Sequence, residues 1–152
     1  VLGGKWTTYR KIAEDAINAA ISINRLKKKK CKTEKLKLAG YKKIVNWNDP
    51  MHVYGSQKKK VESLGGVNDN KSLSNKFHIT NNIIEWSIIH EMALKIEDVL
   101  ARRTRCIFLD AKESKRIAPQ VAKKMAKVLE KDQEWIDEEL KNFNKLIKNY
   151  MT

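Results

Sequence analysis

The spacing of apolar residues in the second half of the chain restricts its fold more than any other feature. From Lys76 to the end, aliphatic residues recur every three or four positions, which places them on one face of an α-helix. Thr80 is a helix-capping residue type. The apolar positions that follow it are Ile84, Ile88, Ile89, Met92, Ala93, Ile96 and Leu100.

Further start signals divide this region into separate helices. Glu97 and Asp98 favour a new first turn, because acidic side chains stabilise the positive end of a helix. Asp110 and Glu113 resemble a capping box, with Asp in the Ser/Thr place. Asp132 is positioned to cap the last helix.

The last two predicted helices carry clear apolar stripes. Pro119 lies inside the first of them and predicts a kink or a broken first half. Three or four amphipathic helices joined by short links predict a small helical bundle over residues 76–152. The two stripes are Ile117, Val121, Met125, Val128 and Leu129, then Ile136, Leu140, Phe143, Ile147 and Tyr150.

Residues 1–26 predict a strand end, a turn and a helix. Two apolar residues precede the Gly3-Gly4 turn, and Thr7 or Thr8 can cap a helix that has many alanines on its apolar face. A helix start offers free N–H groups to an anionic or carbonyl-bearing ligand. By spacing alone, an ordinary glycine turn beside the surface side chain of Lys5 is the simpler interpretation.

Residues 27–75 predict a linker with one short helix at residues 56–64. The run Lys27–Lys30 is expected to be a solvated loop, and contact with an anionic membrane surface is its alternative. Turn-forming residues interrupt the segment at Asp49-Pro50, Gly55 and Gly65-Gly66.

Composition narrows the classes of function. An apolar share of 41% is enough for a packed core, and the net charge of +14 attracts phosphates or anionic surfaces unless the lysines are simply solvated. The chain has two distant cysteines and three scattered histidines, with no metal-ligand spacing, so a reduced intracellular compartment is expected. No apolar run approaches the ~20 residues of a membrane-spanning helix, and no signal peptide is recognised.

Several long segments are distinctive. They are Gly3-Gly4-Lys5-Trp6-Thr7-Thr8-Tyr9-Arg10, Ala13-Glu14-Asp15-Ala16, Cys31-Lys32-Thr33-Glu34, Glu91-Met92-Ala93, the stretch from Glu97 to Arg105, and Phe108-Leu109-Asp110-Ala111. These segments resemble FAD-dependent glycerol-3-phosphate dehydrogenases and oxidases. The first two resemble the end of the FAD-binding domain, the third resembles the stretch that leads from that domain into the C-terminal one, and the others resemble the helical C-terminal domain. The resemblance is weakest over residues 41–75.

This resemblance implies a fold class and a reaction. The fold class is mostly α, a small helical bundle preceded by a strand-turn-helix remnant of an FAD-binding domain. The family oxidises glycerol 3-phosphate to dihydroxyacetone phosphate, and electrons pass through FAD to a quinone or oxygen. The implied location is the mitochondrial inner membrane or the cytoplasmic face of a bacterial plasma membrane, with peripheral membrane contact and no nucleic-acid partner.

The resemblance also implies site residues. The segment from Gly4 to Thr8 would lie beside the isoalloxazine, so the expected cofactor-binding residues are Gly4, Lys5, Trp6, Thr7 and Thr8. Lys5 would in addition hold an oxygen or the phosphate of the substrate. The cluster Arg102-Arg103-Thr104-Arg105 either binds phosphate or pairs with acidic residues such as Glu97, Asp98 and Glu113, and ion pairing is the preferred interpretation.

Residues that such an enzyme needs are missing from these 152 positions. No Gly-x-Gly-x-x-Gly fingerprint is present for the ADP half of FAD, and no catalytic residue is assigned. The first residues, Val1-Leu2-Gly3-Gly4, are more typical of the interior of a domain than of a natural chain start. A free-standing basic helical module that binds nucleic acid or anionic membrane is the alternative, although no helix-turn-helix or RNA-binding motif supports it.

We therefore predict that the 152-residue chain by itself neither binds FAD tightly nor oxidises glycerol 3-phosphate. The measurement is the absorbance spectrum of the purified chain, together with a dye-reduction assay. A stoichiometric flavin spectrum would contradict this prediction.

Overall fold

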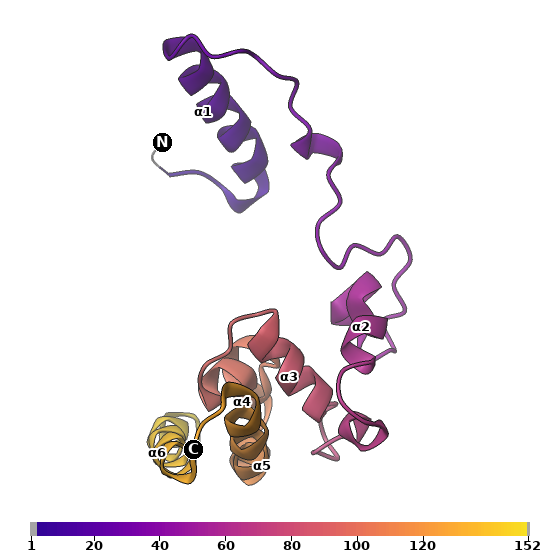
Figure 1. Ribbon diagram of the computed structural model, residues 1–152, viewed down its shortest axis with the longest axis vertical. Helices are drawn as coiled ribbons and strands as arrows, with labels where there is room; N and C mark the ends of the chain where they lie inside the picture. Colours follow the sequence, from indigo (N-terminus) through magenta and orange to yellow (C-terminus); the bar gives the residue numbers. More distant parts are fainter. Residues whose placement is uncertain (1–2, 152) are drawn as a thin grey trace. The chain divides into compact units, whose positions relative to one another are not determined.

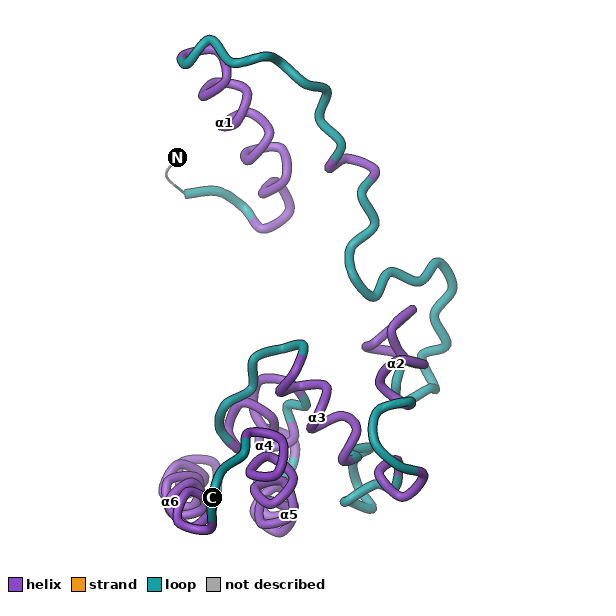
Figure 2. The backbone as a smooth tube through the Cα atoms, viewed as in Figure 1, coloured by secondary structure: helices purple, strands orange, loops and turns teal. Residues whose placement is uncertain are grey.

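The computed structural model describes residues 3–151, which form two compact units, residues 1–41 and 42–152 (Figure 1). Helices and loops make up all of the described residues; their only β-type pairing is an isolated antiparallel bridge between Ser72 and Thr80 (Figure 2). The mostly helical fold class is confirmed. The strand expected before the Gly3-Gly4 turn falls on Val1 and Leu2, outside the described residues.

The first unit contains one long helix. A 3-10 turn, η1 (Trp6–Thr8), leads into α1 (Tyr9–Ile23), and η2 (Thr33–Lys35) follows. The prediction that Thr7 or Thr8 caps this helix is wrong, since neither side chain accepts a capping bond. The Thr8 hydroxyl instead donates to the carbonyl of Lys5 over 3.1 Å, within the same turn.

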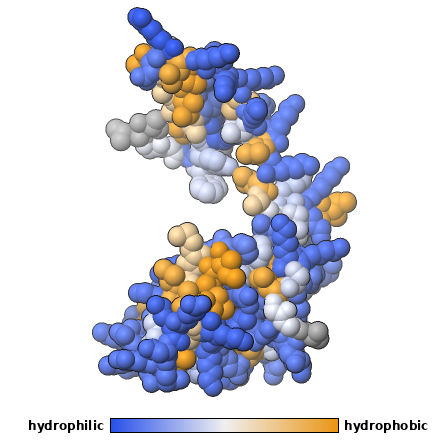
Figure 3. All heavy atoms as spheres, in the orientation of Figure 1, coloured by the Kyte–Doolittle hydropathy of each residue, from blue (hydrophilic) through white to orange (hydrophobic). Residues whose placement is uncertain are grey.

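Within the described residues of the first unit, nothing covers the apolar face of α1. None of its fifteen residues is buried, and Ile17 and Ile23 are 61% and 80% exposed. Apolar side chains accordingly reach the surface of this unit (Figure 3). Exposed aliphatic area of this kind gains free energy when a partner covers it.

The second unit is a bundle of short and long helices. α3 and α6 both pack against α5, and α2 packs on α3. The elements are η3 (His52–Gln57), α2 (Lys58–Glu62), η4 (Val67–Asn70), α3 (Asn81–Ile89), the π-helix η5 (Asp98–Arg103), α4 (Cys106–Leu109), α5 (Ala111–Leu129), α6 (Gln133–Ile147) and η6 (Lys148–Tyr150).

The core of this unit has a large and a small part. The large part joins α3, η5, α5 and α6, with Ile84, Leu100, Val121, Met125 and Ile147 fully buried. The small part packs residues from the predicted linker, Met51 and Val61, against Ile83 and Trp86 of α3. The predicted short helix at residues 56–64 corresponds to the end of η3 together with α2.

Three predicted caps are confirmed. The side chains of Thr80, Asp110 and Asp132 each accept the backbone N–H three residues later. The capping box at Asp110 is only half formed, because the Glu113 carboxylate bonds to Ser74 and Arg116 instead of returning to Asp110.

Two predicted helix details differ in the structure. The helix after Thr80 is shorter than its apolar pattern: α3 ends at Ile89, and Met92 adopts a positive φ of 60° and is 80% exposed. α5 is one helix through Pro119, so the expected broken first half is wrong. Pro119 and Lys115 are both exposed, and Pro119 has no N–H to donate to the Lys115 carbonyl.

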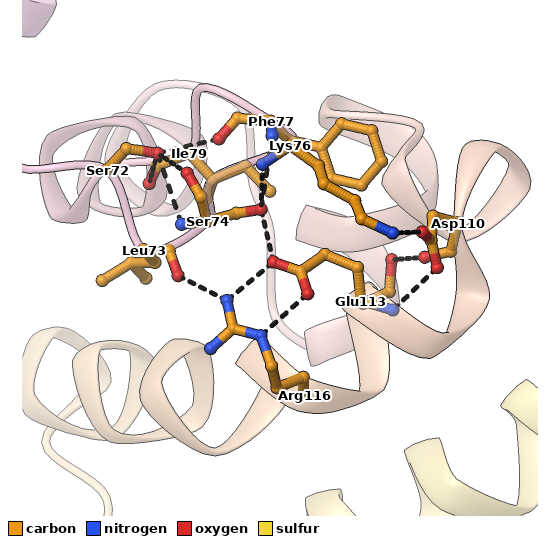
Figure 4. A network of polar contacts seen from close by, with 10 residues as sticks. Ser72, Leu73, Ser74, Lys76, Phe77, Ile79, Asp110, Glu113 and Arg116 are labelled. Carbon is orange, nitrogen blue, oxygen red and sulfur yellow. Dashed lines mark hydrogen bonds and ion pairs between the residues drawn. The ribbon is translucent and has the colours of Figure 1, made fainter.

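A polar network joins the loop before α3 to the start of α5 (Figure 4). Ser74 donates to Glu113 over 2.5 Å, and the Arg116 guanidinium contacts both Glu113 oxygens at 2.6 and 2.7 Å. Lys76 contacts Asp110 at 2.5 Å. The Arg116 guanidinium, followed by the Ser74 hydroxyl, lowers the pKa of Glu113 from its ordinary 4.5 to about 2.

We predict that Glu113 makes the unit sensitive to acid. Because folding lowers the pKa of Glu113, its contribution is complete above about pH 4.5 and is lost as the pH falls toward about 2. Glu113→Gln should unfold more easily at neutral pH and lose less stability between pH 4.5 and 2 than the wild type. Urea unfolding at several pH values measures this. Glu134→Gln, at an exposed position on α6, is the control, and parallel pH profiles for wild type and Glu113→Gln would contradict the prediction.

Candidate functional site

The predicted flavin-facing segment forms one side of a groove on the first unit. The groove has a volume of ≈ 430 Å³ and lies between the chain start and the first two turns of α1. Gly4, Lys5 and Trp6 line it, whereas Thr7 and Thr8 do not. Its other lining residues are Gly3, Tyr9, Ile12, Ala13 and Ala16.

Gly4 is required by the local backbone. Its φ is +135°, and a Cβ at this position would lie 2.7 Å from Cδ1 of Ile12, closer than atoms pack. Gly3 also has a positive φ, of +72°, but a Cβ there would meet nothing within 4 Å. The chain therefore folds back onto α1 at Gly4, and the backbone forms the floor of the groove.

Lys5 and Trp6 extend from this floor into solvent. Lys5 is exposed in extended conformation before η1, and Trp6 is 86% exposed and stacks on Tyr9 with ring centroids 5.5 Å apart. Among the described residues, no hydrogen bond uses the backbone N–H of Trp6 or Thr7. The groove thus combines one cation, unused N–H donors and small apolar side chains.

Arg10 makes side-chain contacts both within α1 and with the residues that follow it. Its guanidinium bonds Glu14 at 2.7 Å, and it also lies 3.3 Å from Oγ1 of Thr33 and 3.8 Å from Sγ of Cys31. This guanidinium is the main reason that the pKa of Glu14 is lowered. The contacts tie α1 to the segment that follows it.

Sequence reasoning missed Tyr9, Ile12, Ala13 and Ala16 as groove residues. The signal was present, because the many alanines on the α1 face indicated close packing against a neighbouring element. What the pattern could not reveal is that the neighbour is the chain start itself, through the turn at Gly4.

The arginines of the Arg102–Arg105 cluster have different contacts. Arg102 pairs with Glu97 at 2.7 Å and with Asp98 at 2.9 Å, which confirms two of the expected ion pairs. The expected pair with Glu113 is wrong, since Glu113 bonds Arg116 on its own helix. Arg103 contacts the carboxylate and the backbone carbonyl of Glu91.

Metal sites and membrane-spanning helices are absent from the described residues. The described part of the chain holds no cluster of three or more His, Cys, Asp or Glu residues suited to a metal ion. Across the same residues, no helix combines the length and the apolar composition that membrane crossing requires. Cys31 and Cys106 are free thiols, and burial raises the pKa of Cys106.

Comparison with known proteins places these features in a family. Residues 31–136 match the family described as the C-terminal domain of alpha-glycerophosphate oxidase. A probable mitochondrial glycerol-3-phosphate dehydrogenase of Dictyostelium discoideum is 33% identical over 97% of this chain and 26% of its own length. A probable glycerol-3-phosphate dehydrogenase of Encephalitozoon cuniculi is 35% identical over 89% and 24%, and the mitochondrial enzyme of Bos taurus is 28% identical over 97% and 23%.

The fold and these matches define a helical domain of the kind found in glycerophosphate-oxidising enzymes. The chain belongs to the family of the C-terminal domain of alpha-glycerophosphate oxidase, and its homologues are glycerol-3-phosphate dehydrogenases. The chain spans about a quarter of the length of these curated relatives. No solved structure matches it.

Proposed function

We propose that this chain acts as the C-terminal part of an FAD-dependent glycerol-3-phosphate dehydrogenase. The observation that carries the proposal is the similarity to glycerol-3-phosphate dehydrogenases over 97% of the chain. In this role residues 1–26 end the flavin-binding domain, residues 27–75 connect it to the next domain, and residues 76–152 form the helical domain. The uncovered apolar face of α1 supports the first assignment.

The groove residues fit the edge of a flavin. The positive φ of Gly4 disfavours any residue with a side chain, and no hydrogen bond within the described residues uses the adjacent N–H of Trp6. Such donors stabilise negative charge on a nearby carbonyl edge. The chemistry that FAD would supply here is acceptance of a hydride from C2 of glycerol 3-phosphate, which yields dihydroxyacetone phosphate.

Lys5 is assigned to the substrate. Its ammonium group is exposed at the groove, and a charge-assisted hydrogen bond from Nζ would hold a phosphate or alkoxide oxygen. Thr8 has a local role, since its hydroxyl already bonds the carbonyl of Lys5 and so fixes the turn that carries this lysine. The electron acceptor in this proposal is a quinone or oxygen.

We predict that Lys5→Met lowers kcat/KM for glycerol 3-phosphate by roughly 10²-fold, because one charged donor to the reacting substrate is lost. The measurement uses the protein expressed from the longest reading frame that contains this chain. Lys5→Arg should recover part of the activity. Lys11→Met, which removes a charge from α1 outside the groove, is the matched control.

Flavin absorbance distinguishes the two proposed roles of Lys5. Loss of activity with full flavin content supports a substrate role, whereas parallel loss of flavin and activity supports a flavin contact. Wild-type kcat/KM in Lys5→Met would refute the assignment of Lys5.

We further propose peripheral membrane association, through the exposed lysines of the loop Lys27–Lys30. Each basic residue near an anionic bilayer contributes about 1 kcal/mol to binding. Replacing all four lysines by Gln should weaken sedimentation with phosphatidylserine vesicles at low salt. The control replaces four exposed lysines of the second unit, Lys112, Lys115, Lys123 and Lys141, and an equal loss in both variants would assign binding to net charge and not to this loop.

A further inference from the structure

A second pocket, of ≈ 620 Å³, lies entirely within the second unit. Three segments form it: the stretch around Tyr54, the loop that leads into α3, and the chain from the end of η5 to the start of α4. We call it the Arg105 pocket. Its volume is within the range of small-molecule sites, about 300–1,000 Å³.

Basic side chains line this pocket, and acidic side chains do not appear among its described lining residues. The basic residues that line it are Lys76, His78, Arg102, Arg103 and Arg105, and no carboxylate is among its described lining residues. A pocket with one sign of charge concentrates ions of the opposite sign. These lining side chains therefore favour an anion over a cation as the ligand.

Three of the five basic groups are already held by carboxylates outside the pocket. Lys76 pairs with Asp110, Arg102 with Glu97 and Asp98, and Arg103 with Glu91. These pairs fix the positions of their side chains and reduce their charge. The two remaining groups, Arg105 and His78, are both exposed, and no ion pair joins either to a carboxylate of the described chain.

The backbone presents Arg105 in an unusual way. It follows the π-helix η5, a wide helix type that is rare and frequent at functional sites. Arg105 itself is left-handed, with φ 59° and ψ 14°. Thr104 closes the π-helix by bonding the carbonyl of Val99 through its N–H at 3.0 Å and its hydroxyl at 2.7 Å. These two bonds fix the position at which the π-helix ends, directly before Arg105.

The opposite wall is apolar and aromatic. Tyr54 and Phe77 are half-buried there, and Ile83 is buried. Tyr54 packs edge-on against Trp86, whose indole N–H donates to Glu91 at 3.1 Å. Burial, followed by the Glu91 carboxylate, raises the pKa of Tyr54.

From this arrangement we propose that the Arg105 pocket binds a soluble phosphate monoester that carries an apolar group. The Arg105 guanidinium contacts the phosphate oxygens, since its planar donors match phosphate in a bidentate manner. His78 adds a donor, and the aromatic wall covers the apolar group. The site is separate from the Lys5 groove and does not rest on the proposed dehydrogenase function.

The test is calorimetric titration of the 152-residue chain with phenyl phosphate, inorganic phosphate and benzyl alcohol. We expect phenyl phosphate to bind most tightly, because only it uses both the basic and the apolar wall. Arg105→Gln should weaken its binding about tenfold, which corresponds to loss of one charge-assisted contact. Arg105→Lys should retain part of the affinity.

Two further variants control for charge and folding. Lys141→Gln removes one exposed positive charge from α6, outside the pocket, and should leave the affinity nearly unchanged. Arg105→Gly suits the positive φ without strain, so weak binding by a variant with wild-type circular dichroism supports a direct contact. Absence of phenyl phosphate binding, or equal weakening by Arg105→Gln and Lys141→Gln, would overturn the proposal.

A lipid headgroup presents the same phosphate chemistry. Flotation with phosphatidic acid vesicles tests whether the Arg105 pocket binds a lipid headgroup. Because we propose a soluble ligand, we expect any vesicle binding to weaken equally in Arg105→Gln and Lys141→Gln. Binding to these vesicles that requires Arg105, without binding to phenyl phosphate, would contradict a soluble ligand.

Discussion

Burial of one apolar stripe on α5 holds the second unit together. Val121, Ala122 and Met125 are fully buried, and they provide the surface onto which α3 and α6 pack. Burial of a side chain such as Val121 or Met125 contributes about 1.5–3 kcal/mol when it leaves water. The loops, the π-helix and the ion pairs around Glu91 and Glu97 are positioned by this packing, because they connect helices whose places the core has fixed.

The first unit lacks this constraint. Its helix buries no residue, and its internal order depends on the turn at Gly4 and the contacts of Arg10. An amphipathic helix with an uncovered face is stabilised mainly by tertiary contacts. The proposed position at the end of a flavin-binding domain would supply them, and it would also place Lys5 and the unused N–H groups against a ligand.

The arginine cluster illustrates how neighbouring residues of one motif acquire different roles. Arg102 and Arg103 are neutralised by carboxylates that lie within reach on the same short stretch of chain. Arg105 follows them by two or three positions, yet it leaves the helix in a left-handed conformation and lines a pocket without acidic residues. This distinction depends on the π-helix, which no periodicity in the sequence indicated.

The sequence by itself determined the helical class, the caps at Thr80, Asp110 and Asp132, and the family, because these depend on local spacing and on residue types within a few positions. Only the tertiary structure decided where α3 ends, that Glu113 turns to Ser74 and Arg116, and that Met51 and Val61 from the predicted linker join the core. The contacts of Ser74 with Glu113, and of Met51 and Val61 with Ile83, join residues far apart in the chain. The spacing of apolar residues specifies which face of a helix is apolar. Tertiary packing determines which element covers that face and which polar side chains meet at the edge of the contact.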